Sequence, residues 1–522
     1  MRSRLSVIRP KAAPWMITAA LGALYVTIAP PTADLAAASY RSYLFAHHGL
    51  SVWDGSWYGG HYLPAYSLLS PALGALLSPT LLAALGATAA AALFGAVVKL
   101  YFSERGARVG GIWFAAGAGA ELFSGRVTFE LGLALALGSL LAAVRGRRAG
   151  SLALALATPL ASPVAGAFLA LAGLADALTG FPRRGLALAA SALAPILLLA
   201  LAFPEGGWEP FVASSFWPAL ALVLLLAWLL GPVKPALRAG ALLYGAALIG
   251  AFALHTPVGG NAVRLGALMA GPLAACALIG RRGRVLLVLS PALLYWQLIA
   301  PVRDLASGAS DPAVQASYYT PLIERLGALG ALGSPTRIEV LPTRDHWEAR
   351  ILAPYVSLAR GWERQLDERY DSIFYRSSLS AAAYLAWLRE NAVAYVALPS
   401  APLDHSARSE DRLIHSNPSF LREVWRSAHW RLFAVSPATP LAAPPAVLRA
   451  LGTDSFTVYA PRAGIYEVRV HYTPYWHSRQ ALACVSRAPD GWTRVRVASA
   501  GQVAVGIEFS LRRLLQGSPR CQ

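Results

Sequence analysis

The sequence predicts a polytopic α-helical membrane protein with about eleven transmembrane helices, followed by an extracytoplasmic α/β domain and a β-sandwich. Three observations support this fold class. Of the 522 residues, 56% are hydrophobic and only 14% are charged, so the first three hundred residues are too apolar for a soluble core. Basic residues cluster between the hydrophobic runs. After residue 302, short β-type runs alternate with helical patterns.

Eleven hydrophobic runs, separated by charged or turn-forming residues, are the candidate helices. They cover residues 14–30, 80–102, 109–123, 127–144, 151–162, 164–179, 185–203, 216–232, 239–256, 264–280 and 285–302. Several are shorter than the roughly 20 residues that cross a bilayer alone. The segment 151–179, broken at Ser162 and Pro163, could be two half-spans or one kinked span. We interpret residues 14–30 as a retained first helix rather than a cleaved signal peptide.

The basic clusters predict the orientation, because short cytoplasmic loops carry an excess of Lys and Arg. If segment 151–179 crosses twice, all the clusters share the side of the basic N-terminus. Their members are Arg145, Arg147, Arg148, Arg183, Arg184, Lys234, Arg238, Arg281, Arg282 and Arg284. This agreement favours eleven crossings of a bacterial plasma membrane, with the N-terminus cytoplasmic and residues 303–522 outside. The clusters also explain the net charge of +18, so we expect no nucleic-acid partner.

An outer loop at residues 31–66 concentrates polar and aromatic side chains in an otherwise Ala-, Leu- and Gly-rich region. It contains Asp34 and Asp54, and a carboxylate at a membrane interface is costly unless it is solvated or paired. An ionised carboxylate there could act as a general base toward a hydroxyl group. Alternatively, Asp34 caps the following helix and Asp54 caps the turn at Asp54-Gly55.

Three histidines, His47, His48 and His61, belong to the same loop. Neutral imidazoles could position a phosphate or a hydroxyl, and His61 is the better candidate because Gly59 and Gly60 permit close approach of a ligand. A divalent metal is possible, although no clear ligand set supports one.

The apolar segment 63–79 is interrupted by prolines and is short for a crossing. We expect it to lie at the interface or dip into it. Five aromatic residues would then sit at headgroup depth, where amphipathic rings are enriched. They are Trp53, Trp57, Tyr58, Tyr62 and Tyr66.

Two arginines, Arg126 and Arg264, lie on the predicted outer side, against the charge rule. Each could extend to the lipid headgroups, or pair with a buried anion. In the run GGNAVRL, Arg264 and the nearby Asn261 stand at the start of a helix. An arginine at the mouth of a membrane cavity suits a lipid-linked phosphate, which it can bind with two parallel hydrogen bonds.

The external region divides by composition into residues 303–440, predicted to form an α/β domain, and residues 441–522, predicted to form an antiparallel β-sandwich. The aromatic and charged run 344–367 could bind carbohydrate, but such runs are more often solvated faces or interdomain salt bridges, which we favour. Cys276 is expected to be a small buried hydrophobe. Cys484 and Cys521 could form an external disulfide.

With these elements placed, the chain resembles the GT-C superfamily of polyprenyl-phosphate-dependent membrane glycosyltransferases. More narrowly, it resembles actinobacterial integral membrane proteins of YfhO-like arrangement, whose reaction is often unassigned. The likeness covers residues 1 to 302 and is carried by the first span, PTAD, WYGGHYLPAYS and the odd helix number. It implies that Asp34 is the base. Members often have a second acid beside the first, whereas here Leu35 follows and the nearest loop carboxylate is Asp54.

The resemblance implies inverting sugar transfer from a polyprenyl-phosphate donor to an envelope glycan or lipid on the outer side of the bilayer. Asp34 and Asp54 are the catalytic candidates, and Arg126 and Arg264 would stabilise the leaving phosphate. The other expected substrate-binding residues are His61, Trp57, Tyr58 and Asn261. Two alternatives remain, a transporter or flippase of a lipid-linked envelope molecule and a non-catalytic scaffold for envelope assembly. No internal repeat typical of transporters is visible.

Overall fold

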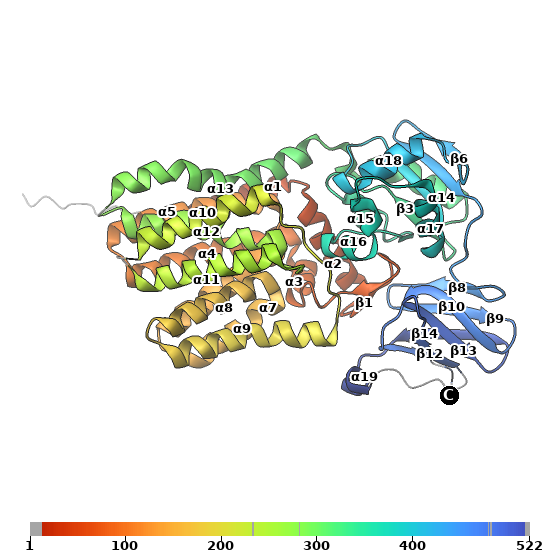
Figure 1. Cartoon of the computed structure of the whole chain (residues 1–522), viewed down its shortest axis with the longest axis horizontal. Coiled ribbons are helices and arrows are strands. Elements are labelled where there is room, and N and C mark those ends of the chain that lie inside the picture. The colour runs from red at the N-terminus through yellow and green to blue at the C-terminus, as the bar shows by residue number, and fades with distance from the viewer. Residues whose placement is uncertain (1–12, 232–233, 281, 479, 481–482, 517–522) are drawn as a thin grey trace, which may run out of the picture.

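The computed structural model describes residues 13–231, 234–280, 282–478, 480 and 483–516. A helical bundle forms one end of an elongated molecule, and two β-containing domains form the other (Figure 1). Each of the eleven predicted runs is a helix. These helices are α1 (Trp15–Ile28), α4 (Pro79–Tyr101), α5 (Glu104–Glu121), α6 (Val127–Val144), α7 (Arg148–Ala161), α8 (Pro163–Leu178), α9 (Pro182–Ala202), α10 (Ala213–Leu230), α11 (Pro235–Ala253), α12 (Val263–Leu278) and α13 (Gly283–Ser310).

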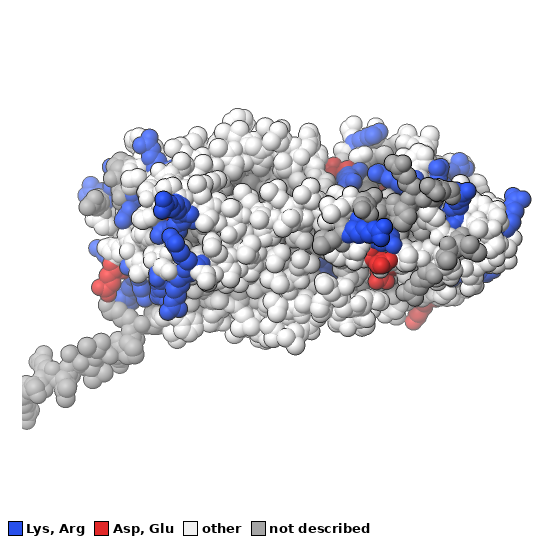
Figure 2. Space-filling view, turned by 90° about the horizontal axis from the view of Figure 1, so that it is seen from below, with Lys and Arg blue, Asp and Glu red and all other residues white. Residues whose placement is uncertain are grey.

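Many large apolar side chains of the bundle face outward, as expected where lipid replaces water. Leu201, Trp228 and Val288 are each more than 70% exposed. On the face seen in Figure 2, a band almost without charge crosses the bundle. Within the described residues, seven helices are long and apolar enough to cross a membrane, or eight if the bent pair α1 and α2 (Ala33–His48) forms one span. The predicted multi-pass helical protein is confirmed, and the number of eleven crossings stays a prediction.

The segment at Ser162 and Pro163 is a hairpin of two helices rather than one kinked helix. Ser139 of α6 donates a hydrogen bond to the carbonyl of Ser151 near the start of α7, whereas a side chain at Gly132, a turn from the other end of α6, would meet Ser162. The chain thus returns along α6 before α8 packs against α9. Pro163 opens α8, and the Ser162 hydroxyl caps it.

This hairpin brings the basic clusters to one end of the bundle, remote from the β-containing domains (Figure 2). Their exposed members include Arg145, Arg147, Arg148, Arg183, Arg238, Arg282 and Arg284. Arg281 lies outside the described residues. The grouping that predicted the orientation is therefore present in the structure, and the assignment of this end to the cytoplasm stays a prediction.

The first external domain has a five-stranded mixed sheet in the order β4-β3-β5-β7-β6. The strands are β3 (Arg337–Val340), β4 (Ser357–Leu358), β5 (Val393–Pro399), β6 (Leu421–Arg426) and β7 (Trp430–Val435). β3 runs parallel to β4 and β5, and β7 runs antiparallel to β5 and β6. The helices around it are α14 (Ala316–Ala328), α15 (Trp347–Ile351), α16 (Arg364–Tyr370), α17 (Ala381–Glu390) and α18 (Arg408–His415). The predicted α/β architecture is confirmed, although α13 continues past residue 302 to Ser310.

The second external domain is the predicted antiparallel sandwich, with sheets in the orders β10-β13-β12 and β11-β14-β9-β8. Its strands are β8 (Val447–Leu451), β9 (Ser455–Ala460), β10 (Gly464–His471), β11 (Trp476–Ser478), β12 (Ala483–Arg487), β13 (Trp492–Val497) and β14 (Gly501–Ile507), followed by α19 (Leu511–Gln516). Cys276 is a buried free cysteine, as predicted. Cys521 lies outside the described residues, so its disulfide with Cys484 stays a prediction.

The run WDGSWYGGHY forms a small hairpin, β1 (Trp53–Asp54) paired with β2 (His61–Tyr62), that is wedged between the two external domains. Trp53 and Tyr62 belong to the core of the β-sandwich, whereas Trp57 and Tyr58 belong to that of the α/β domain. All four are at most 8% exposed. The prediction that these four aromatic residues lie at headgroup depth is therefore wrong, because the external domains cover them. The segment after them contains the short helix α3 (Leu69–Leu77).

Candidate active site

Asp34 stands in the first turn of α2, at the end of the bundle that faces the β-containing domains. Thr32, not Asp34, is the N-cap residue of α2, so the capping alternative for Asp34 is wrong. Its carboxylate instead accepts a hydrogen bond from Arg126 Nε over 3.2 Å. The Asp34 side chain keeps 33% of its surface exposed. It is therefore paired and still accessible, which is what a general base on a bound substrate requires.

Arg126 reaches Asp34 because the chain turns sharply between η1 (Leu122–Ser124) and α6. Gly125 supplies that turn with a φ of 74°, and a Cβ there would collide with the Thr32 hydroxyl. The guanidinium also donates to Glu121 Oε1 over 2.5 Å and lies 3.7 Å from Asp304 Oδ2. Three carboxylates from α2, α5 and α13 thus surround one arginine. Asp304 was not among the residues predicted from sequence.

Arg264, in the first turn of α12, approaches the same carboxylate from another side. Its Nη2 is 3.7 Å from Asp34 Oδ2, which is beyond hydrogen-bond distance. The Arg264 guanidinium lies 5.8 Å from the ring of Phe129, and its side chain is 18% exposed. Of the two alternatives for these arginines, pairing with a buried anion is confirmed for Arg126, whose partner Glu121 is 10% exposed. The nearest anion to Arg264 is the partly exposed Asp34. Asn261 lies three residues before Arg264, in η2 (Gly259–Ala262).

The external α/β domain covers this site. The Trp362 indole donates to the Ala33 carbonyl over 2.8 Å, one residue before Asp34. Arg41, two turns further along α2, forms a buried ion pair with Glu363, and its guanidinium lies 3.8 Å from the ring centre of Tyr66. The loop at residues 361–363 is therefore anchored on α2 at two points, beside Asp34 and two turns beyond it.

Glu209, in the loop between α9 and α10, adds a further ionisable group. Burial raises the pKa of Glu209 to about 7, while the positive charges of Arg364 and Arg264 act in the opposite direction. The negative charge of Asp34 also raises the pKa of Glu209. Glu209 is thus a carboxyl group that titrates near neutral pH and whose pKa depends on the charges of Arg264 and Asp34.

Asp54 lies outside the group of side chains around Asp34. It is fully buried, accepting hydrogen bonds from the Tyr40 hydroxyl over 3.1 Å and from the Ser56 amide over 2.9 Å. The second bond is the turn cap that the sequence offered as an alternative. Burial raises the pKa of Asp54 to about 6. This carboxyl group stabilises the β1–β2 hairpin and has no exposed surface on which a substrate could act.

His61, Trp57 and Tyr58 are held in the same buried region. The rings of His61 and Trp57 are stacked, with centroids 5.6 Å apart, and burial lowers the pKa of His61 to about 3. The Trp57 indole donates to the Ala349 carbonyl, and the Tyr58 hydroxyl accepts from the Glu363 amide. The groups that approach Gly59 and Gly60 are the rings of Trp492 and Trp53, so protein occupies the space suggested for a ligand.

The charged run 344–367 forms ion pairs of two kinds. Arg41–Glu363 is an interdomain pair, as the favoured interpretation predicted, whereas other pairs lie within the α/β domain. Arg360 is buried and donates two hydrogen bonds to Asp367, and Arg364 does the same to Asp404. The imidazole of His346 stacks on Trp362 with centroids 3.5 Å apart. Across the part of the chain that the structure describes, no group of three His, Cys, Asp or Glu side chains is placed to hold a metal ion.

Comparison with known proteins yields a distant structural similarity. No family model matches the sequence, and no curated protein matches it. The cryo-EM structure of the arabinofuranosyltransferase AftD from mycobacteria aligns with 95% of this chain and 57% of its own, at 14% identity and a TM-score of 0.47. This chain thus spans little more than half the length of that protein. A likeness of this size carries no information about activity.

Proposed function

We propose that this chain is a membrane glycosyltransferase of the GT-C type, which transfers a sugar from a polyprenyl-phosphate donor to a glycan or lipid of the cell envelope. The proposal places the reaction on the outer face of a bacterial plasma membrane. The narrower resemblance to YfhO-like proteins supplies no further site residue for this proposal. One observation carries the proposal, which is the meeting of Asp34, Arg126 and Arg264 within 3.7 Å at the end of the bundle that faces the β-containing domains.

In the proposed reaction, an acceptor hydroxyl attacks the anomeric carbon of the donor sugar, and the bond from that carbon to the phosphate oxygen breaks. Asp34 accepts the hydroxyl proton, since its carboxylate is partly exposed and held in one orientation by Arg126. The phosphate leaves with the bonding electron pair. Arg264 lies too far from Asp34 for a hydrogen bond, so its donors can bind the leaving phosphate and stabilise the charge that develops on it.

The two arginines have different parts in this proposal. Arg126 already donates to Asp34 and Glu121, so it positions the base. Arg264 contacts Asp34 at longer range and supplies a positive charge to the same space. Of the three carboxylates around Arg126, Asp34 is the most exposed. Together with Arg264 it suits a substrate that brings a phosphate and a hydroxyl group together.

The test is sugar transfer by membranes that contain the full chain, supplied with a radiolabelled polyprenyl-phosphate sugar and envelope lipid or glycan acceptors. Asp34→Asn keeps the size of the side chain and removes the base, so product formation should fall by about 10²-fold or more. Asp176→Asn is the matched control, because Asp176 also pairs with an arginine, Arg184, and is similarly exposed at the opposite end of the bundle. An Asp34→Asn variant with full activity would exclude Asp34 as the base.

A further inference from the structure

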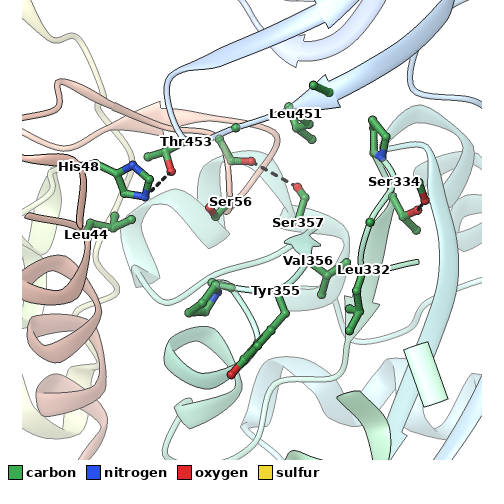
Figure 3. A pocket seen from close by; sticks show the side chains of 18 of the residues that line it. Leu44, His48, Ser56, Leu332, Ser334, Tyr355, Val356, Ser357, Leu451 and Thr453 are labelled. Atoms are coloured by element: carbon green, nitrogen blue, oxygen red, sulfur yellow. Dashed lines mark hydrogen bonds between the residues drawn. The ribbon is translucent and has the colours of Figure 1, made fainter. Parts of the chain in front are cut away.

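A cavity of about 430 Å³ lies where α2, the α/β domain and the β-sandwich meet. Side chains from five separate stretches converge on it, and one of them is Ser56 of the β1–β2 hairpin (Figure 3). The other four stretches contribute Leu44 and His48 of α2, Leu332 and Ser334 before β3, Tyr355 and Ser357 around β4, and Leu451 and Thr453 around the β8–β9 turn. Ligand sites of this size are common at domain interfaces. The cavity is separate from the groups around Asp34.

The lining combines hydroxyl groups with aromatic rings. Five Ser and Thr side chains and three tyrosines contribute, namely Ser56, Ser334, Thr336, Ser357, Thr453, Tyr40, Tyr43 and Tyr355. Each hydroxyl both donates and accepts hydrogen bonds, as sugar hydroxyls do, and aromatic rings present apolar faces on which the C–H faces of a sugar ring can pack. None of the described residues that line the cavity is acidic, and the basic ones are His48 and Arg449.

Some of the lining hydroxyl groups are already paired. The Tyr40 hydroxyl donates to Asp54 over 3.1 Å, and the Ser334 hydroxyl donates to the Gly330 carbonyl over 2.7 Å. Two others are held only weakly. The Thr453 hydroxyl and His48 Nε2 are 3.4 Å apart, and the Ser357 hydroxyl is 3.3 Å from the Gly55 carbonyl. Both distances are long for hydrogen bonds of neutral groups. A ligand rich in hydroxyl groups can exchange these weak contacts for shorter ones.

The position of the cavity relates it to the proposed active site. Asp34 stands in the first turn of α2, whereas Tyr43 and His48 lie on its second half. At 1.5 Å per residue, Tyr43 is about 14 Å and His48 about 21 Å along the helix from Asp34. A ligand in the cavity therefore lies too far away to react at Asp34, but an extended chain could be held here while its end reaches the base.

We propose that this interdomain cavity binds a neutral oligosaccharide segment of the acceptor glycan, at a distance from the sugar that reacts. The assignment of that glycan as the acceptor rests on the proposed function, whereas binding itself does not. Remote contacts of this kind increase the affinity for a long acceptor without touching the reacting atoms. They also select a polymeric acceptor over a short one.

The test is binding of the purified full chain in detergent to an array of neutral pentose and hexose tetrasaccharides, with uronic-acid oligosaccharides and inorganic phosphate as anionic probes. Wild type should bind at least one neutral tetrasaccharide. It should bind none of the anionic probes more tightly than that tetrasaccharide. Ser334→Trp, at the exposed rim of the cavity, should abolish this binding by filling the space. Ser419→Trp, which is equally exposed but outside the cavity, is the control and should bind like wild type.

Asp34→Asn separates this proposal from the proposed function. It should lose sugar transfer and still bind the tetrasaccharide as tightly as wild type. Absence of neutral-glycan binding by wild type, stronger binding of the anionic probes, or unchanged binding by Ser334→Trp would each overturn the cavity assignment. Failure of the transferase proposal would instead show as an active Asp34→Asn variant.

Discussion

Arg41 of the helical bundle and Glu363 of the external α/β domain form a buried ion pair across 322 positions of sequence. Their side chains are 3% and 14% exposed, and the Arg41 guanidinium also packs on Tyr66. This pair joins the two parts of the molecule at the middle of α2, two turns beyond Asp34.

Removal of one partner of this pair should destabilise the protein strongly, because the remaining charge stays buried without compensation. We expect Glu363→Ala to lower the free energy of unfolding by about 3–5 kcal/mol. Thermal denaturation of the detergent-solubilised chain measures the effect. The corresponding change at Asp176, whose pair with Arg184 is more exposed, should cost at most about 1 kcal/mol. Equal effects of the two changes would contradict a buried pair.

Arg264 should matter for activity more than for stability. Arg264→Ala removes a guanidinium that makes no close hydrogen bond to Asp34, so the denaturation midpoint should change little. Loss of the charge opposite the leaving phosphate should lower kcat/KM by roughly 10²–10³-fold. Arg126→Ala should instead lower the midpoint as well, since Asp34, Glu121 and Asp304 lose their common partner. If the two variants behave alike in both measurements, the division of roles between the arginines is wrong.

Gly60 should not tolerate a side chain. Its φ is 117°, and a Cβ there would overlap the Trp53 ring, so Gly60→Ala combines backbone strain with a clash inside the interdomain wedge. Gly491→Ala is the control, because Gly491 has a φ of 95° and nothing within 4 Å of its Cβ position. The control variant should lose only about 1–2 kcal/mol of stability, through backbone strain. Gly60→Ala should lose clearly more, and denaturation midpoints of the two variants measure the difference.

Glu205 should make stability depend on pH. Burial raises the pKa of Glu205 from 4.5 to about 8, and its carboxyl group accepts a hydrogen bond from the Tyr62 amide over 2.6 Å. The folded state thus binds its proton more tightly than the unfolded state does. Its contribution to stability is complete below pH 4.5 and is lost as the pH rises through about 8.

Glu205→Gln is the matched variant, since it keeps an acceptor for Tyr62 and cannot ionise. Its denaturation midpoint should match that of wild type near pH 4.5 and exceed it near pH 9, by an amount that corresponds to a few kcal/mol. Parallel curves for the two proteins over this pH range would show that Glu205 is not shifted. Gln is the right replacement because Ala would also remove the hydrogen bond.

Several features of the fold were predictable from local sequence. Hydrophobic runs predicted the eleven helices, because the hydrocarbon core requires continuous apolar surface and internally satisfied backbone groups. Basic clusters, such as Arg145, Arg147 and Arg148, predicted which loops lie together at one end of the bundle. Alternating apolar residues and turn signals predicted β3, β5 and β7 of the α/β domain and β9, β10, β13 and β14 of the sandwich, but not the remaining strands of these domains. Each of these signals acts over a few neighbouring residues.

The predictions that failed concerned contacts between distant segments. Tryptophans such as Trp53 and Trp57 often anchor a protein at the membrane–water interface. The sequence does not reveal that two folded domains bury them. Asp54 and His61 lie in the same loop as Asp34, yet the path of the chain buries them in the wedge. In their place Asp304, 270 positions after Asp34, reaches Arg126.

By itself, the sequence determined that the chain is a multi-pass helical membrane protein with α/β and β-sandwich domains after it, and it singled out Asp34, Arg126 and Arg264. Only the tertiary structure decided that these three meet at one site, while WDGSWYGGH joins the domains. The physical reason is that hydropathy and turn chemistry act locally. The pairing of charges depends on the packing of helices far apart in the chain, because a buried charge must find its counterion wherever the fold places one.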